Sequence, residues 1–175
     1  MIIGISGKAG SGKDTLASFI KEFTNCNIVH FADPLKESVR VMANLSHNDV
    51  YTQEGKKHTI DWLNDMTVRE LLQKVGTAIR NEVDPDFWVK RLIQEIDNSS
   101  LTIIPDVRFL NEVNAIKDAG GIVIRIERNG INTGAHISET ALDNYNNWNM
   151  VIFNDYSLET LKEQAKNIIK LWRLD

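Results

Sequence analysis

Several residue types and patterns are scarce in this sequence, and each scarcity excludes a class of protein. The 175 residues contain a single cysteine, Cys26, so no internal disulfide can form. No apolar run approaches the roughly 20 residues of a membrane-spanning helix. The apolar start, residues 1–5, is too short for a signal peptide. We therefore expect a cytoplasmic protein without a membrane partner.

Basic residues are not in excess and form no block along the chain. The sequence has 20 Lys and Arg against 24 Asp and Glu, a formal net charge of -4. A protein that binds nucleic acid chains usually neutralises several phosphates with a clustered basic surface. A nucleic acid polymer is therefore not the expected partner. The hydrophobic content of 42% suffices for the core of one domain, whose oligomeric state, monomer or homodimer, the composition leaves open.

The sequence does contain a regular alternation of short apolar runs and amphipathic segments. The apolar runs are short and rich in β-branched residues, which predicts buried strands, and the amphipathic segments have helical spacing. Such alternation is typical of a parallel sheet covered on both faces. We therefore predict an α/β fold of three layers with a five-stranded parallel sheet. The predicted strands are residues 2–6, 27–32, 101–104, 122–126 and 150–153, and helices begin near residues 14, 34, 67, 84, 111 and 158.

Two segments interrupt this alternation. Between residues 44 and 65 the periodicity fades into polar residues, and we interpret this stretch as a mobile insertion. A loop with Gly, Asn and Thr follows the fourth predicted strand, and we expect residues of about 127–140 to act as a lid. The predicted organisation is a single domain, residues 1–175, with these two moving segments.

A glycine-rich stretch between the first predicted strand and the first predicted helix is the strongest functional signal. Gly7, Gly12 and Lys13 have the G-x-x-x-x-G-K spacing of a phosphate-binding loop. The glycines let successive backbone N–H groups point at one anion, while the helix dipole and the lysine add positive charge. We therefore expect the loop to bind ATP. The predicted contacts are Gly7, Ala9, Gly10, Ser11, Gly12, Lys13, Asp14 and Thr15.

The residue after the loop lysine departs from the usual pattern. Ser or Thr normally stands there and binds Mg²⁺ through its hydroxyl, but this chain has Asp14, with Thr15 one place later. Two interpretations of Asp14 stay open. Its carboxylate either binds Mg²⁺ or the water around it, or it only stabilises the helix N-terminus through the dipole.

Charged residues gather where the predicted strands end, which is where parallel α/β sheets bind their ligands. Transfer of a phosphoryl group between two phosphates needs cations there, because negative charge builds on the moving group. We therefore predict catalytic roles for Lys13, Arg108 and Arg128. Asp106 is predicted to join them by holding Mg²⁺ or its water shell. The strand-end residues are Asp33, Lys36, Asp106, Arg108, Arg125 and Arg128.

Four short segments follow, in order, the pattern of a known family: GKDT at 12–15, ADPLK at 32–36, DVRF at 106–109 and HISE at 136–139. In these segments the chain resembles the bacteriophage deoxynucleoside monophosphate kinases. The resemblance implies a nucleoside monophosphate kinase-like P-loop fold, ATP with Mg²⁺, and phosphorylation of a deoxynucleoside monophosphate to the diphosphate. The acceptor contacts that it implies are Asp33, Lys36, Arg80, Trp88 and Arg108. His136 is a further candidate, which is either structural or in contact with substrate.

The same segments also resemble animal-type phosphomevalonate kinases, which share the Gly-Lys-Asp ending, the Asp-Val-Arg element and a Leu-Asp-Asn stretch like residues 142–144. That family has a second arginine where this chain has Phe109. A small-molecule kinase of this kind is therefore the alternative. A nucleotide-hydrolysing switch or motor is less favoured, because the chain lacks an Asn-Lys-x-Asp element and an acidic pair after the third predicted strand.

Overall fold

The computed structural model describes residues 1–97, 99–131 and 136–174, which divide into two units. The first unit contains Met1–His30 and Ile96–Asp175, and the second contains Phe31–Glu95. The single domain with a mobile insertion and a lid stays a prediction, and residues 132–135 of the expected lid lie outside the described residues. None of the helices in the described ranges is both long enough and apolar enough to cross a membrane.

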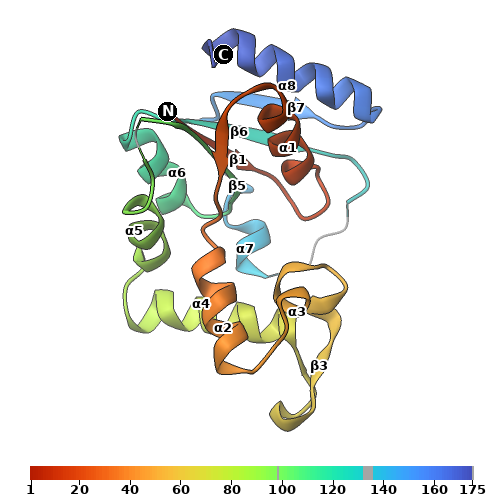
Figure 1. Cartoon of the computed structure of the whole chain (residues 1–175), viewed down its shortest axis with the longest axis vertical. Helices are drawn as coiled ribbons and strands as arrows, with labels where there is room; N and C mark the ends of the chain where they lie inside the picture. The colour runs from red at the N-terminus through yellow and green to blue at the C-terminus, as the bar shows by residue number, and fades with distance from the viewer. Residues whose placement is uncertain (98, 132–135, 175) are drawn as a thin grey trace. The chain divides into compact units, whose positions relative to one another are not determined.

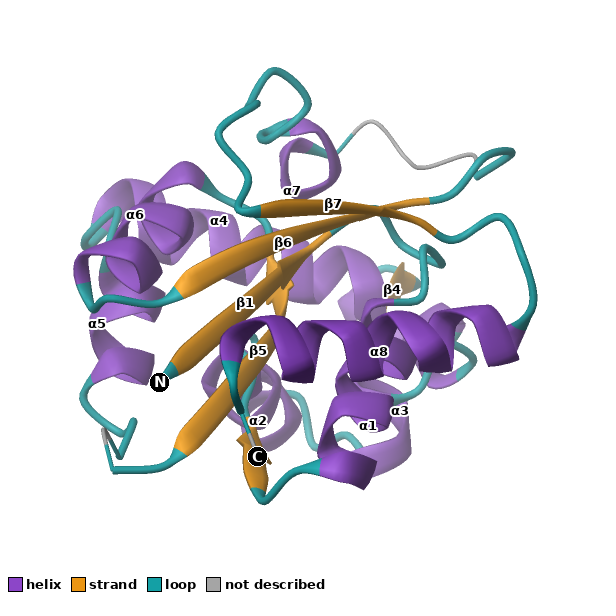
Figure 2. Cartoon of the chain, turned by 90° about the horizontal axis from the view of Figure 1, so that it is seen from above, coloured by secondary structure: helices purple, strands orange, loops and turns teal. Residues whose placement is uncertain are grey.

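The first unit is built on a parallel sheet. Its strands are β1 (Ile2–Ser6), β2 (Cys26–Ile28), β5 (Leu101–Val107), β6 (Ile122–Glu127) and β7 (Met150–Phe153). The order β2-β5-β1-β6-β7, with every neighbouring pair parallel, confirms the predicted five-stranded parallel sheet. The central strand β1 leads into the glycine-rich loop, so β5 and β6 end on either side of that loop (Figure 2).

Helices cover both faces of this sheet, as predicted. The helices of the first unit are α1 (Lys13–Phe23), α6 (Leu110–Asp118), α7 (Ile137–Thr140) and α8 (Leu158–Trp172). α1 and α8 pack beside one another and share a core with Ile3 and Ile5 of β1 (Figure 1). Between these two isoleucines Gly4 faces α6, and a Cβ on Gly4 would lie 2.7 Å from Ile116 Cδ1. The small residue therefore lets α6 pack closely on the opposite face.

The second unit has its own apolar core, which includes Val39, Val50 and Leu72. The capping box predicted at Thr67 is confirmed: the Thr67 hydroxyl accepts the Glu70 N–H at 3.2 Å, and Glu70 accepts the Thr67 N–H at 2.8 Å. The elements are α2 (Asp33–Met42), α3 (His47–Tyr51), η1 (Gly55–Lys57), β3 (Thr59–Ile60), η2 (Asp61–Leu63), β4 (Met66–Thr67), α4 (Val68–Glu82) and α5 (Phe87–Ile93).

Three predicted boundaries differ from the structure by more than one residue. β5 ends at Val107 rather than at residue 104, so Asp106 lies within the strand and not after it. α5 begins at Phe87 rather than at Asp84, because the Asp84 carboxylate accepts the Asp86 N–H at 2.8 Å and the Lys90 ammonium at 2.6 Å. These bonds close a turn before the helix, so Asp84 is not its N-cap. β2 ends at Ile28 rather than at residue 32: after one more bond from the Val29 N–H to the Ile103 carbonyl at 3.0 Å, residues 31–32 form the turn that precedes α2.

Candidate active site

The glycine-rich loop, residues 7–13, joins β1 to α1 in a shape that depends on two glycines. Gly7 passes so close to β6 that a Cβ would lie 2.4 Å from the Ile126 carbonyl oxygen. Gly12 is the N-cap of α1 with φ of 101°, in the left-handed region that glycine adopts readily. The Ser11 N–H donates to the Lys8 carbonyl at 3.1 Å and closes the turn. The loop therefore curls over the N-terminus of α1, where an anion is favoured.

Lys13 lies folded over this loop. Its Nζ donates to the Lys8 carbonyl oxygen at 2.8 Å, and only 6% of the residue is exposed. Burial, and after it the nearby Arg108 guanidinium, lower the pKa of Lys13 to about 8, against the opposite effect of Asp14, Glu139 and Asp106. At neutral pH the loop therefore holds a poorly solvated positive charge, which a bound anion would stabilise.

Asp106 and Arg108 flank the start of the loop, as the strand-end argument predicts. Val107, between them, pairs with Ser6 at the end of β1. The fully buried Glu112 carboxylate fixes the backbone here, since it accepts the Arg108 N–H at 2.6 Å and the Phe109 N–H at 3.0 Å. The structure therefore brings Lys13, Asp106 and Arg108 together at one edge of the sheet.

Glu139 connects Arg108 to the loop, a role that the sequence did not predict. Its Oε1 accepts a hydrogen bond from Arg108 Nη1, which also donates to the Ser138 carbonyl at 3.2 Å. Its Oε2 accepts the Ala9 N–H at 2.9 Å. Burial alone would raise the pKa of the Glu139 carboxyl, but Arg108 and the Ala9 amide together hold it below its usual value. The carboxylate is therefore anionic at neutral pH.

Asn154, directly after β7, stabilises the glycine-rich loop through a hydrogen bond to Ser11. Its Nδ2 donates to the Ser11 carbonyl at 2.9 Å and lies 2.5 Å from where a Cβ of Gly12 would stand. The next residue, Asp155, accepts both the backbone and the side-chain N–H of Asn129 at 2.7 Å. Neither residue was predicted from the sequence, although both follow a predicted strand at the same sheet edge.

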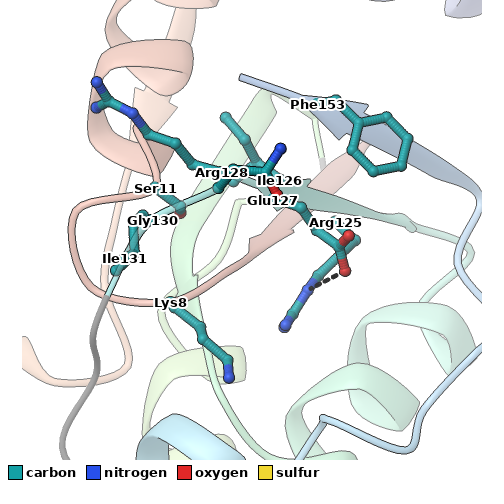
Figure 3. A pocket seen from close by; sticks show the side chains of 10 residues that line it. Lys8, Ser11, Arg125, Ile126, Glu127, Arg128, Gly130, Ile131 and Phe153 are labelled. Carbon is teal, nitrogen blue, oxygen red and sulfur yellow. Dashed lines mark ion pairs between the residues drawn. The ribbon is translucent and has the colours of Figure 1, made fainter. Parts of the chain in front are cut away.

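A pocket of about 300 Å³ lies beside the loop at the ends of β6 and β7. In Figure 3 the Lys8 and Arg125 side chains extend toward one side of it, whereas Arg128 extends away from them. Arg125 is buried, donates to Ser6 Oγ at 3.3 Å and lies 5.5 Å from the Trp148 ring centre. Arg128 is exposed. The pocket is lined by Lys8, Ser11, Arg125, Ile126, Glu127, Arg128, Asn129, Gly130, Ile131 and Phe153.

Asp14 stands in the first turn of α1 with 83% of its side chain exposed, 3.7 Å from His30 Nε2. Because Gly12 is the N-cap, Asp14 does not cap the helix directly, yet its charge still lies near the positive end of the dipole. Both interpretations of Asp14, a metal contact or a stabiliser of the helix, therefore stay open.

Four predicted acceptor contacts belong to the second unit. Lys36 Nζ lies 2.8 Å from Asp33 Oδ1 and 4.7 Å from the centre of the Tyr51 ring. Burial, followed by the charge of Asp33, raises the pKa of Tyr51 to about 12. The structure thus brings two predicted residues together and adds an aromatic ring, Tyr51, that the sequence analysis did not name.

The other predicted contacts have structural partners of their own. Trp88 is buried and its indole N–H donates to the Gly76 carbonyl at 3.3 Å, while Arg80 is half-buried on α4. In the first unit, His136 Nδ1 accepts the Ser138 N–H at 3.2 Å and caps α7. Their roles toward a substrate stay predictions.

A parallel sheet whose central strand enters a glycine-rich anion loop, with a buried lysine beside it, is the fold of P-loop kinases. A solved structure with this fold is shikimate kinase from Aquifex aeolicus, with a TM-score of 0.53, 14% sequence identity and coverage of 99% of each chain. At that identity the similarity shows the fold alone.

Sequence comparison gives the family. The family model described as deoxynucleotide monophosphate kinase matches residues 44–165. A protein of Acanthamoeba polyphaga mimivirus, provisionally named a deoxynucleotide monophosphate kinase, is 33% identical over 94% of this chain and 93% of its own. The deoxynucleotide monophosphate kinase of Enterobacteria phage T4 is 35% identical over 81% of this chain and 58% of its own length.

The chain belongs to the deoxynucleotide monophosphate kinase family. It spans a little over half of the phage protein, and nearly all of the mimivirus protein. The resemblance seen in the sequence is therefore confirmed, and nothing in these matches supports the phosphomevalonate kinase alternative.

Proposed function

We propose that this protein transfers the γ-phosphoryl group of ATP to a deoxynucleoside monophosphate, yielding ADP and a deoxynucleoside diphosphate, in the cytoplasm. The observation that carries the proposal is the anion-binding loop with the buried Lys13 ammonium, at a sheet edge that also carries Arg108. Family membership and the names of the two relatives support a deoxynucleotide as the acceptor.

The loop is the proposed site of the donor. Its N–H groups would bind the triphosphate together with Lys13, whose bond to the Lys8 carbonyl would be exchanged for phosphate oxygens. The adjoining pocket, at about 300 Å³, reaches the lower end of the volumes typical of small-ligand sites. We place the nucleoside part of ATP there, with Arg128 at its rim.

Arg108 is the proposed cation for the transferred group. Phosphoryl transfer depends chiefly on positioning and on cations that match the charge of the transition state. Arg108 meets both needs, because Glu112 fixes its backbone and its guanidinium lies near enough to Lys13 to lower that residue's pKa. The proposed contacts for the acceptor are Asp33, Lys36, Arg80, Trp88, Arg108 and His136.

The acidic residues near the loop fit Mg²⁺, which prefers one or two carboxylates together with substrate phosphates. Asp106 acts on the Lys13 pKa and Asp14 is exposed at the start of α1. Within the described ranges no group of three or more His, Cys, Asp or Glu could hold an ion by itself, so the phosphates would have to complete the shell. When bound, Mg²⁺ would neutralise charge on the phosphate oxygens.

A turnover assay tests this proposal. The protein is incubated with ATP, MgCl₂ and each of the four common deoxynucleoside monophosphates, and the products are separated by anion-exchange chromatography. We expect ADP and the matching diphosphate in equal amounts with at least one acceptor, and no diphosphate from the Lys13→Ala variant. Formation of ADP without any diphosphate would instead indicate hydrolysis, and no product with all four would reject the acceptor class.

A further inference from the structure

A carboxylate of the protein occupies part of the anion-binding loop. The Ala9 N–H, one of the groups expected to bind phosphate, donates at 2.9 Å to Glu139 Oε2. The Glu139 side chain is 12% exposed and Ala9 is exposed, so this bond lies at the protein surface, where a ligand can reach it. Carboxylate and phosphate oxygens both accept strong bonds from backbone N–H groups. Glu139 and a donor phosphate would therefore compete for the same amide.

The same carboxylate also holds the arginine proposed for catalysis. Its other oxygen accepts from Arg108 Nη1, and the Ser138 carbonyl accepts from the same nitrogen at 3.2 Å. An anion that displaces Glu139 from Ala9 would therefore also disturb its bond to Arg108. One side chain thus links the proposed donor site to the proposed transfer cation.

A second acid, Asp143, follows α7 and lies against Lys8, the loop residue before Ala9. Asp143 Oδ2 lies 3.4 Å from Lys8 Nζ, and its side chain is 38% exposed. Asp143 contacts an ammonium group, whereas Glu139 contacts a backbone amide. The two acids therefore place similar charge near the loop, but only Glu139 takes up a phosphate-binding N–H group.

We propose that Glu139 occupies the place of a donor phosphate in the nucleotide-free protein, and that the donor, by displacing it, releases Arg108 for the acceptor. This inference rests on the proposed function. Glu139 is then a positioning residue that acts through Arg108. Since the donor frees a group that the acceptor uses, each ligand should strengthen the binding of the other.

Calorimetric titration with inorganic tripolyphosphate tests whether Glu139 occupies the place of a donor phosphate, and it does not require turnover. Glu139→Gln should lower the dissociation constant about tenfold or more, because it weakens a charge-assisted competitor for the amide. Asp143→Asn removes the same charge without freeing the amide, so its effect measures how much of any gain is general electrostatics. Glu163→Gln, a surface residue of α8 that pairs with Lys166, should change nothing.

The comparison of these variants decides the matter. If Glu139→Gln gains no more affinity for tripolyphosphate than Asp143→Asn does, the effect is general electrostatics and the proposal is overturned. A loss of affinity in Glu139→Gln would also overturn it. A second test uses the unaltered protein. Hydrogen exchange at residues 139–143 should become faster when tripolyphosphate binds. Unchanged or slower exchange there would show that the carboxylate is not displaced.

The second part of the proposal, the release of Arg108, predicts coupling between the donor and acceptor sites. Tripolyphosphate should tighten binding of the best deoxynucleoside monophosphate about fivefold or more in the unaltered protein. In Glu139→Gln that acceptor should bind tightly without tripolyphosphate, so the coupling should largely disappear. Coupling of equal size in both proteins would refute the release of Arg108. If no monophosphate binds or turns over, the proposed function fails, while the tripolyphosphate titration still decides what Glu139 occupies.

Discussion

ATP should bind less tightly as the pH rises above about 8, because of Lys13. Burial, with Arg108 adding to it, lowers the pKa of this ammonium to about 8 in the free protein. Bound triphosphate would place anionic oxygens beside it, which returns the pKa toward or above the ordinary value of 10.5. Binding must then take up a proton wherever Lys13 is neutral in the free protein, so the affinity falls with rising pH.

The size of the effect follows from the pKa. A group with a pKa of about 8 is about nine-tenths protonated at pH 7 and about one-tenth protonated at pH 9. Proton uptake on binding should therefore rise from about 0.1 to about 0.9, and the dissociation constant should increase about tenfold between these pH values. Calorimetric titration with a non-hydrolysable ATP analogue, in two buffers of different ionisation enthalpy at each pH, measures both quantities.

The Lys13→Arg variant is the matched control. A guanidinium group stays protonated throughout this range, so its affinity, whatever its absolute value, should not change between pH 7 and 9. Constant affinity without proton uptake in the unaltered protein would refute the reasoning. So would an equal pH dependence in the arginine variant, because the titrating group would then be another one.

Three further predictions concern residues of the same edge. Lys13→Met should raise the free energy of unfolding at pH 7 by about 2 kcal/mol, since relief from burying the charge outweighs the lost bond to the Lys8 carbonyl. This gain in stability should shrink between pH 8 and 10.5, as the lysine of the unaltered protein loses its proton. Urea unfolding at several pH values measures the gain, and a Lys13→Met variant less stable than the unaltered protein would contradict the prediction. Arg108→Ala should lower kcat about 10²- to 10³-fold in steady-state kinetics, and Arg108→Lys should restore only part; an unchanged kcat would remove Arg108 from the mechanism. Asn154→Ala should raise the KM for ATP more than the KM for the acceptor, because it loses the bond to the Ser11 carbonyl; equal changes in both would count against a role confined to the loop.

The sequence predicted the fold well where the pattern is long or carries a cap. β1 and β7 are apolar runs, α8 has apolar residues at helical spacing, and α4 has a capping box, so their positions agree with the prediction. The elements between residues 44 and 65 were missed because none is long enough to show a period. α5 was placed too early because the Asp84 carboxylate closes a turn instead of capping the helix. Such a choice depends on local geometry that residue types alone do not determine.

The site was predictable where its chemistry is contiguous in sequence. The loop and Lys13 form one motif, and the strand-end rule placed Asp106 and Arg108 beside it. The same rule would have found Asn154. By contrast, the bond between Ala9 and Glu139 joins positions 130 residues apart, and no spacing in the sequence indicates it. Contacts of that kind arise only when the chain is folded.

The central claim is that the glycine-rich loop binds the triphosphate of the donor. A crystal structure of the protein with a non-hydrolysable ATP analogue and Mg²⁺ tests it most directly. We predict phosphate oxygens within hydrogen-bond distance of the backbone N–H groups of residues 9–14 and of Lys13 Nζ, with Glu139 no longer bonded to the Ala9 N–H. A triphosphate bound anywhere else on the chain would contradict the account.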